Sequence, residues 1–208
     1  MYVRQFMISQ VFTVNPDETI VDVMALMREK KIRRVPVVEN GKLVGFVTDG
    51  DLREVSPSPA TTLSIWELNH LIAKTTIREV AIKKVVTCTP DTRLEDAASL
   101  MIEHRITGLP VVDEGKLIGI ITLVEVVNAF LDVMGSRSPG KRVVIEAKDQ
   151  IGVVSDLGVA TKENDVNIGS LAVFHRSENQ VRILVHLEGD KVAEVETSLE
   201  KKGYRITK

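Results

Sequence analysis

The sequence lacks the features that mark secreted and membrane-spanning proteins. It has a single cysteine, Cys88, so it cannot form a disulfide within the chain, which suits a reducing compartment. Residues 1–10 lack the continuous apolar run of a signal peptide, and no stretch of about 18 apolar residues follows them. We therefore expect a soluble, cytoplasmic protein with no membrane partner.

A surplus of positive charge is also missing. The 27 lysines and arginines are balanced by 29 aspartates and glutamates, giving a net charge of −2. Such a balance does not predict the broad cationic surface that neutralises the phosphates of a nucleic acid. The sequence contains no helix-turn-helix, zinc knuckle or aromatic stacking platform either, so we expect no nucleic-acid partner.

Catalytic and metal-binding motifs are absent too. The four histidines (His70, His104, His175 and His186) have no metal-ligand spacing, and neither a Gly-x-Ser-x-Gly turn nor a Walker lysine loop is present. Cys88 lies in an apolar run, which favours packing as a small hydrophobe over catalysis. We predict no metal, no catalytic residue and no catalytic cofactor. An enzyme stays a weaker alternative, because residues distant in sequence can converge in a fold.

The first two thirds of the chain contain an internal repeat. Shifting the sequence by 74 positions (110 − 36) superposes many identical residues without a gap. The matches include Thr13 with Thr87, Pro16 with Pro90, Pro36-Val37-Val38 with Pro110-Val111-Val112, Gly41-Lys42-Leu43 with Gly115-Lys116-Leu117, and Thr48 with Thr122. So dense a match predicts two copies of one structural unit.

The residue pattern of each copy predicts the order of strands and helices β-α-β-β-α. A short apolar strand leads to Pro16, and a helix follows with one apolar face, made of Ile20, Val23, Met24 and Met27. Thr19 with Asp22, and Thr92 with Glu95, have capping-box spacing at the helix starts. Strands are predicted at residues 35–38 and 43–47, joined by a tight Asn40-Gly41 turn, which Glu114-Gly115 replaces in the second copy. Because neither unit buries its sheet alone, we expect the two copies to pack sheet to sheet as a pseudo-twofold pair, with clefts at their strand ends.

The segment between the copies combines a break and a helix. Residues 56–60 read Ser-Pro-Ser-Pro-Ala, which disfavours regular structure, and residues 65–74 predict an amphipathic helix that bridges the repeats. Trp66 on that helix is expected to pack, with stacking on a ligand as the less favoured alternative.

A threonine three residues before a carboxylate closes the second hairpin strand of each copy. These pairs are Thr48 with Asp51 and Thr122 with Glu125. A carboxylate at such a corner can accept both hydroxyls of a ribose, while the threonine hydroxyl and free N–H groups favour an anion. A Thr-x-x-Asp capping box explains the spacing equally well when it is considered alone.

The corners recur in fixed order with residues 13–16, Arg33-Arg34-Val35-Pro36 and the hairpin glycine. In this combination residues 1–130 resemble the CBS (cystathionine-β-synthase) domain family, in which a pair of domains forms a Bateman module. Members commonly bind AMP, ADP, ATP or S-adenosylmethionine. The resemblance implies that adenine is bordered by Thr13, Val14 and Pro16, ribose is held by Asp51, and phosphate is faced by Thr48.

Two arginines of the first copy have uncharged counterparts in the second, which predicts that the two clefts differ in their ability to bind a ligand. Arg33 and Arg34 occupy the basic pair that approaches phosphates in nucleotide-binding members of the family, and a solvated strand entrance is the alternative. The second copy has Thr107-Gly108 at these positions and Glu125 in place of the aspartate. Its candidate residues (Thr87, Pro90, Thr122 and Glu125) therefore predict a weaker site, or one for a ligand without phosphate.

The last third predicts a second kind of domain. After a polar break at residues 135–140, the patterns predict strands at 143–147, 166–173, 181–187 and 204–207, with helices at 153–163 and 192–202. This β-α-β-β-α-β order, with glycine at the first turn, resembles a ferredoxin-like ACT domain. The resemblance implies an amino acid bound between paired subunits, at Asp149, Gly152 and Asn167. An ordinary turn explains these residues equally well.

Together these patterns predict an α+β protein with CBS domain 1 at residues 1–60, a linker helix with CBS domain 2 at 61–134, and an ACT domain at 142–208. This order is similar to that of AcuB-type acetoin-utilisation regulatory proteins. It implies a homodimeric sensor that binds an adenine nucleotide as a regulatory ligand and signals to a protein target. The alternative is an amino-acid sensor whose CBS pair serves as a dimerisation scaffold.

Overall fold

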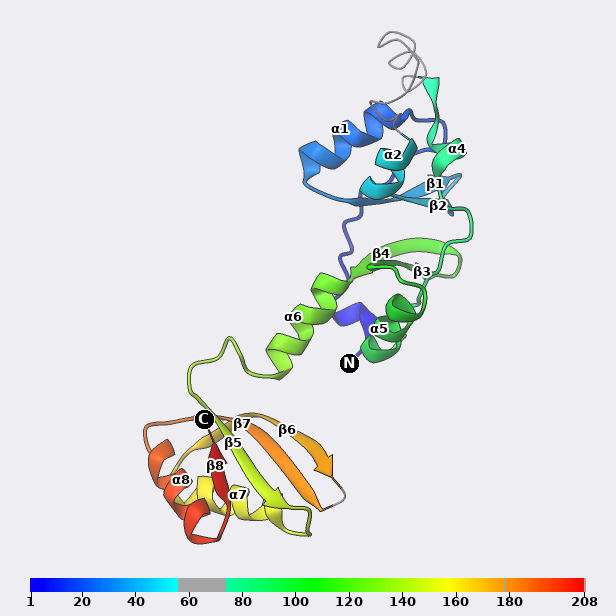
Figure 1. Ribbon diagram of the computed structural model, residues 1–208. Coiled ribbons are helices and arrows are strands. Elements are labelled where there is room, and N and C mark those ends of the chain that lie inside the picture. The colour runs from blue at the N-terminus through cyan, green and yellow to red at the C-terminus, as the bar shows by residue number, and fades with distance from the viewer. Residues whose placement is uncertain (56–73, 178, 208) are drawn as a thin grey trace. The chain divides into compact units, whose positions relative to one another are not determined.

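The structure is a computed structural model that describes residues 1–55, 74–177 and 179–207. It divides into two compact units, Met1–Val126 and Val127–Lys208 (Figure 1). The predicted break at residues 56–60 lies outside the described residues. So does the predicted bridging helix with Trp66, apart from its last residue.

The first unit contains both copies of the repeat. The first copy has α1 (Ile20–Lys30), β1 (Arg34–Glu39), β2 (Lys42–Thr48) and α2 (Asp49–Val55). The second has α5 (Leu94–Glu103), β3 (Gly108–Asp113), β4 (Lys116–Thr122) and α6 (Leu123–Val133), and α6 continues into the second unit. Two short helices precede the copies, η1 (Val3–Gln5) and α4 (Ile77–Val80). The last four elements of the predicted order, α-β-β-α, are therefore present in both copies.

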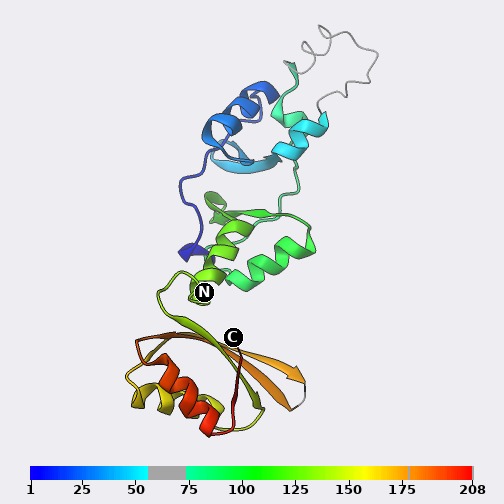
Figure 2. The same ribbon diagram turned by 60° about the vertical axis from the view of Figure 1, so that its left-hand side comes forward.

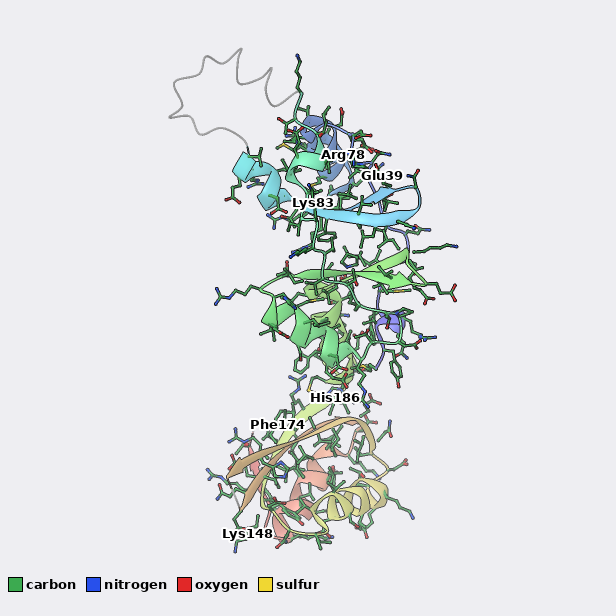
Figure 3. The ribbon with its side chains drawn as sticks, turned by 90° about the vertical axis from the view of Figure 1, so that its right-hand side faces the viewer. Glu39, Arg78, Lys83, Lys148, Phe174 and His186 are labelled. Atoms are coloured by element: carbon green, nitrogen blue, oxygen red, sulfur yellow. The ribbon has the colours of Figure 1, made fainter. Side chains whose placement is uncertain are left out.

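The two hairpins form one four-stranded sheet in the order β1-β2-β4-β3, and only the antiparallel pair of Lys42 with Lys116 joins its halves. Figure 3 shows the hairpins facing each other, with their helices on the outer sides. Both turns have left-handed backbone at their two central residues, with φ of 52° and 78° at Asn40-Gly41 and 46° and 80° at Glu114-Gly115. The predicted tight turns are confirmed, since two positive φ angles allow a two-residue hairpin connection.

The helix starts agree with the prediction in the first copy only. Thr19 caps α1, where its hydroxyl accepts a hydrogen bond from the Asp22 amide at 3.2 Å and donates one to the Asp22 carboxylate at 2.7 Å. In the second copy Arg93 is the N-cap residue of α5 and makes no side-chain cap. The predicted cap at Thr92 is wrong, because its hydroxyl instead accepts a hydrogen bond from the Thr89 amide at 2.9 Å, within the preceding turn.

The predicted first strand of each copy is reduced to an isolated bridge. Val14 pairs with Val37, and Cys88 pairs with Val111, both in parallel orientation. The Cys88 side chain is 5% exposed and its Sγ lies 3.9 Å from the Pro110 carbonyl oxygen. Burial raises the pKa of this thiol to about 11, so Cys88 packs as a small hydrophobe, as predicted.

The segments that precede the two copies cross over to the opposite copy. Ile8 and Ile120 exchange backbone hydrogen bonds of 2.9 and 3.0 Å, and Ile82 and Phe46 exchange bonds of 2.9 and 3.0 Å. Ile77 is fully buried in the apolar core of the first copy. The repeat therefore begins near residues 3 and 77, about ten residues earlier than the sequence comparison placed it, and each copy completes the other.

The second unit has the predicted β-α-β-β-α-β order. Its elements are β5 (Lys141–Lys148), α7 (Val153–Glu163), β6 (Asn167–Ser177), β7 (Gln180–Glu188), α8 (Val192–Lys201) and β8 (Arg205–Thr207). The strands form an antiparallel sheet in the order β6-β7-β5-β8, and α7 and α8 lie on one face of it (Figures 1 and 2). Ile145, Leu157, Ile183 and Leu199 are among the residues buried between the sheet and the helices. Among the described parts of the chain, no helix is long and apolar enough to span a membrane.

Candidate functional site

One candidate site is a hollow in the first unit that contains Asp51, and we call it the Asp51 hollow. It has a volume of about 530 Å³, within the range of roughly 300–1,000 Å³ that is common for small-molecule sites. Its lining comes from both copies of the repeat and comprises Arg33, Arg34, Phe46, Thr48, Asp49, Gly50, Asp51, Arg53, Ile82, Lys84, Val85, Val86, Arg105, Ile106, Thr107 and Gly108. The structure thus brings four of the predicted binding residues (Arg33, Arg34, Thr48 and Asp51) to one cavity.

The corner between β2 and α2 forms the capping box that was the alternative explanation for its sequence. Oδ2 of Asp51 accepts hydrogen bonds from the Thr48 amide at 2.8 Å and from the Thr48 hydroxyl at 2.7 Å, and the hydroxyl accepts one from the Asp51 amide at 3.2 Å. Among the described residues, none donates a hydrogen bond to the other carboxylate oxygen, Oδ1. The cap therefore fixes the Asp51 carboxylate at the wall of the hollow and leaves one oxygen for a ligand.

The two predicted arginines differ in their surroundings. The Arg33 guanidinium is exposed and lies 3.6 Å from the Asp49 carboxylate, which Arg53 also approaches, at 3.1 Å. Arg34 is half-buried, and its guanidinium donates a hydrogen bond to the Thr107 hydroxyl of the second copy. Burial and the charge of Arg33 lower the pKa of Arg34, while the carboxylate of Glu125 opposes this shift. Arg34 is therefore a cation that spans the two copies.

Gly108 makes room for Arg34. A Cβ atom at residue 108 would lie 3.0 Å from Cδ of Arg34, closer than ordinary van der Waals contact. Residues 34 and 108 occupy equivalent positions in the two copies, and near a pseudo-twofold axis such positions face each other. One of them is large and the other has no side chain, so only one copy can supply an arginine there.

The apolar part of the hollow was not predicted from the sequence. It comes from the segment that leads into the second copy, through Ile82, Val85 and Val86, and from Phe46 and Ile106. Ile82 is 44% exposed although it is a large hydrophobe. If the shift of 74 residues is extended back from Thr87, Ile82 matches Ile8. The sequence does not show that the segments preceding the two copies (the lead-in segments) cross over to the opposite copy, and this crossing places Ile82 in the same hollow as Asp51.

Thr13, Val14 and Pro16 do not line this hollow. Val14 is buried against the first copy's own hairpin, Pro16 is buried and its carbonyl accepts a hydrogen bond from the Arg78 amide, and Thr13 is exposed. Their counterparts Thr87 and Pro90 do not line it either, although Val85 and Val86 do. The structure therefore places the second copy's lead-in segment beside Asp51, and contact of Thr13, Val14 and Pro16 with adenine stays a prediction.

Comparison with known families explains the repeat. The family described as CBS domain matches residues 3–58 and again residues 77–132, which together are more than half of the chain. The chain belongs to the CBS domain family. Both matches begin where the structure begins the repeat, and they are offset by the same 74 residues (77 − 3). They end at residue 132, so the ACT domain at 142–208 stays a prediction.

Several known proteins resemble the CBS pair. YhcV, a CBS domain-containing protein of Bacillus subtilis (strain 168), is 36% identical over 121 residues, covering 58% of this chain and 79% of YhcV. The structure of CBSX2 in complex with AMP is 36% identical with a TM-score of 0.53, covering 62% of this chain and 96% of CBSX2.

Two further solved structures match at lower identity. The AcuB structure from Vibrio cholerae is 29% identical with a TM-score of 0.55, covering 68% of this chain and 98% of AcuB. The CBS domain pair of MJ0100, in complex with 5′-methylthioadenosine and S-adenosylmethionine, is 25% identical with a TM-score of 0.53, covering 62% of this chain and 99% of that pair. The predicted likeness to AcuB holds for the CBS pair.

The second CBS repeat has an equivalent corner between β4 and α6. The Thr122 amide donates a hydrogen bond to Oε2 of Glu125 at 3.0 Å, and the Thr122 hydroxyl donates another to the same oxygen. Neither residue lines the Asp51 hollow. The charge of Glu125 raises the pKa of Arg34, in opposition to burial and to the charge of Arg33.

In the second unit the predicted residues separate. Asp149 and Gly152 line a hollow of about 340 Å³ together with His175, whose Nε2 lies 3.5 Å from the Asp149 carboxylate. Gly152 has a φ of 105° and precedes α7, so its backbone bends as predicted. Asn167 is not in this hollow; it begins β6, and its amide donates a hydrogen bond to Glu188 at 3.2 Å. Within one chain the three residues do not form a single site.

Proposed function

We propose that this CBS protein is a regulatory sensor that binds an adenine nucleotide in the Asp51 hollow and has no catalytic activity of its own. One observation carries the proposal. The capped carboxylate of Asp51 and the cations Arg33 and Arg34 line a single cavity of nucleoside size, whose lining also includes apolar side chains. Few ligands combine an apolar ring, a diol and an anion in this way, and a nucleotide is one of them.

Each part of a nucleotide has a matching surface in the hollow. Ile82 and Val86 offer apolar contact for a purine. Oδ1 of Asp51 can accept hydrogen bonds from the ribose hydroxyls, and charge-assisted bonds of this kind are stronger than neutral ones. Arg33 and Arg34 supply guanidinium groups, which match phosphate geometry.

Known ligands of relatives support the choice of adenosine. CBSX2 is described in complex with AMP, and the MJ0100 domain pair in complex with 5′-methylthioadenosine and S-adenosylmethionine. Both proteins are similar to this chain over the CBS pair, where the Asp51 hollow lies.

The hollow is well placed for sensing because its walls belong to different CBS repeats. Asp51 lies in the first repeat, whereas Val86 and Thr107 lie in the second. A ligand that touches both walls binds one arrangement of the repeats more tightly than another, and it shifts the population by that difference in affinity. We propose that a homodimer transmits this shift to a protein target.

We further propose CBS domain 1 at residues 1–60, a linker with CBS domain 2 at 61–134, and an ACT domain at 142–208. The element order β-α-β-β-α-β and the strand order of the second unit support the ACT assignment. The alternative function is amino-acid sensing through the ACT domain at Asp149, Gly152 and Asn167, with the CBS pair serving as a dimerisation scaffold. A screen by thermal unfolding separates the two, since a ligand at a hundred times its Kd adds about 2.7 kcal/mol of stability.

Calorimetric titration of AMP into matched variants tests the proposal. Asp51→Ala removes a charged hydrogen-bond acceptor and should weaken binding by about tenfold to a hundredfold. Glu125→Ala is the control, because it deletes the equivalent capping carboxylate of the second repeat outside the hollow. Equal losses of affinity in the two variants, or unchanged binding by Asp51→Ala, would contradict the assignment.

A further inference from the structure

The Asp51 hollow has a surplus of positive charge. Its lining contains five cationic side chains (Arg33, Arg34, Arg53, Lys84 and Arg105) and two carboxylates (Asp49 and Asp51). The difference is three positive charges (5 − 2), although the chain as a whole carries a net charge of −2. Positive charge is therefore concentrated in this cavity, which attracts anions from solution.

Neighbouring carboxylates neutralise only some of these cations. Arg33 and Arg53 both approach the Asp49 carboxylate, at 3.6 and 3.1 Å. Lys84 and Arg105 are exposed, and among the described residues neither forms an ion pair or a side-chain hydrogen bond. Lys84 and Arg105 therefore keep their donors for a ligand.

The surplus belongs to one side of the CBS pair. Under the shift of 74 residues, Lys84 corresponds to Gln10 and Arg53 corresponds to Val127, so these positions are cationic only around the Asp51 hollow. Arg105 ends the turn after α5 with a φ of 53°, a left-handed conformation that residues other than glycine adopt uncommonly. Arg105 corresponds to Lys31, which is also basic and has the same φ of 53°, so Lys84 and Arg53 are the cations of this hollow that do not follow from the repeat.

Charge distinguishes the adenosine ligands from one another. AMP has one phosphate, which Arg33 and Arg34 are sufficient to bind. ADP and ATP carry further phosphates, and these need further cationic donors. S-adenosylmethionine carries a sulfonium and an ammonium group against one carboxylate, so a cationic cavity repels it.

We propose that the Asp51 hollow is selective for an adenine nucleotide with a diphosphate or triphosphate chain, and that Lys84 and Arg105 are its specificity-determining residues. This inference rests on the proposed function and adds the class of ligand. The adenosine part lies at Asp51, and the outer phosphates lie at Lys84 and Arg105.

Competition among ligands of different charge tests the inference. ATP, ADP, AMP and S-adenosylmethionine are titrated calorimetrically into the full chain without magnesium, at about 50 mM and about 300 mM KCl, because salt screens exposed charges. We expect ATP and ADP to bind at least about tenfold more tightly than AMP at low salt, and this advantage to shrink at high salt. S-adenosylmethionine should bind most weakly.

Charge-neutralising variants identify the residues. Lys84→Gln and Arg105→Gln should each weaken ATP binding by about tenfold and AMP binding by less than about threefold. Lys83→Gln is the matched control, since Lys83 is the exposed neighbour of Lys84 but does not line the hollow. It should leave both affinities unchanged. All three side chains are exposed, so the variants should keep the wild-type Tm.

The outcomes separate the two proposals. If AMP binds as tightly as ATP, if S-adenosylmethionine binds most tightly, or if Lys83→Gln matches Lys84→Gln, the selectivity is overturned while adenosine binding stands. If no adenosine ligand binds at all, the proposed function fails and this inference fails with it.

Discussion

Replacing Gly108 with alanine should disturb the nucleotide site without unfolding the protein. The new Cβ atom would lie 3.0 Å from Cδ and 3.4 Å from Nε of Arg34, and 3.5 Å from Cγ2 of Thr122. The third distance is ordinary contact and the first is too short, so Arg34 must move by a few tenths of an ångström or more. This movement displaces the guanidinium and should weaken its hydrogen bond to Thr107.

The expected change in stability is small because two effects oppose each other. Gly108 does not have a positive φ, so its backbone accepts alanine. Gly→Ala at a compatible position stabilises a protein by about 0.4–1 kcal/mol through the unfolded state. Weakening the hydrogen bond from Arg34 to Thr107 should cost about 0.5–1.5 kcal/mol, part of the roughly 1.5–3 kcal/mol of a hydrogen bond to a charged group. The free energy of unfolding should therefore change by less than about 1 kcal/mol in either direction.

The affinity for AMP should change much more. Moving the Arg34 guanidinium away from the hollow removes one charged phosphate contact, which corresponds to about tenfold weaker binding. Urea unfolding measures the stability, and calorimetric titration measures the Kd. Gly158→Ala is the control, since a Cβ there has no atom within 4 Å and the residue lies in α7 of the other unit. If Gly108→Ala gains stability as Gly158→Ala does and binds AMP like the wild type, then the lack of a side chain at residue 108 does not determine the position of Arg34.

Two further predictions concern stability. Glu114→Asn should raise the free energy of unfolding by about 0.5–1 kcal/mol in urea titrations, because residue 114 has a φ of 46° and asparagine, present at the equivalent Asn40, tolerates this conformation better; no gain would show that the turn is unstrained. Tyr204→Phe removes the hydroxyl that donates to Asp156 at 2.6 Å, and hydrogen bonds from Lys202 and Tyr204 hold the pKa of that carboxyl below its ordinary value of 3.8. Wild type should therefore be more stable than Tyr204→Phe above pH 3.8, with the difference shrinking as the pH falls through the lowered pKa of Asp156; a difference independent of pH would assign it to packing alone.

Local patterns were enough to predict most of the fold. The period of apolar residues gave α1 and α7, and the Asn40-Gly41 turn gave the first hairpin, because these features depend on residues close together in the chain. The predicted cap at Thr92 failed because the same spacing also suits a tight turn with Thr89. Such competition between two local hydrogen bonds cannot be decided from spacing alone.

The sequence predicted the residues of only one wall of the Asp51 hollow. Asp51 and the two arginines follow from the motif, and the structure places them in one hollow. Lys84 and Arg105 come from the other repeat, and their position depends on the crossing of the lead-in segments, a tertiary feature that periodicity does not encode. Val86 lines the hollow for the same reason, whereas contact of Thr13 with adenine stays a prediction.

Crystals of the protein grown with AMP would test the central claim most directly. The account predicts the nucleoside in the Asp51 hollow, with its ribose hydroxyls within hydrogen-bond distance of the Asp51 carboxylate and its base against Ile82 and Val86. AMP bound at the Glu125 corner or in the second unit, with the Asp51 hollow free of it, would contradict the account.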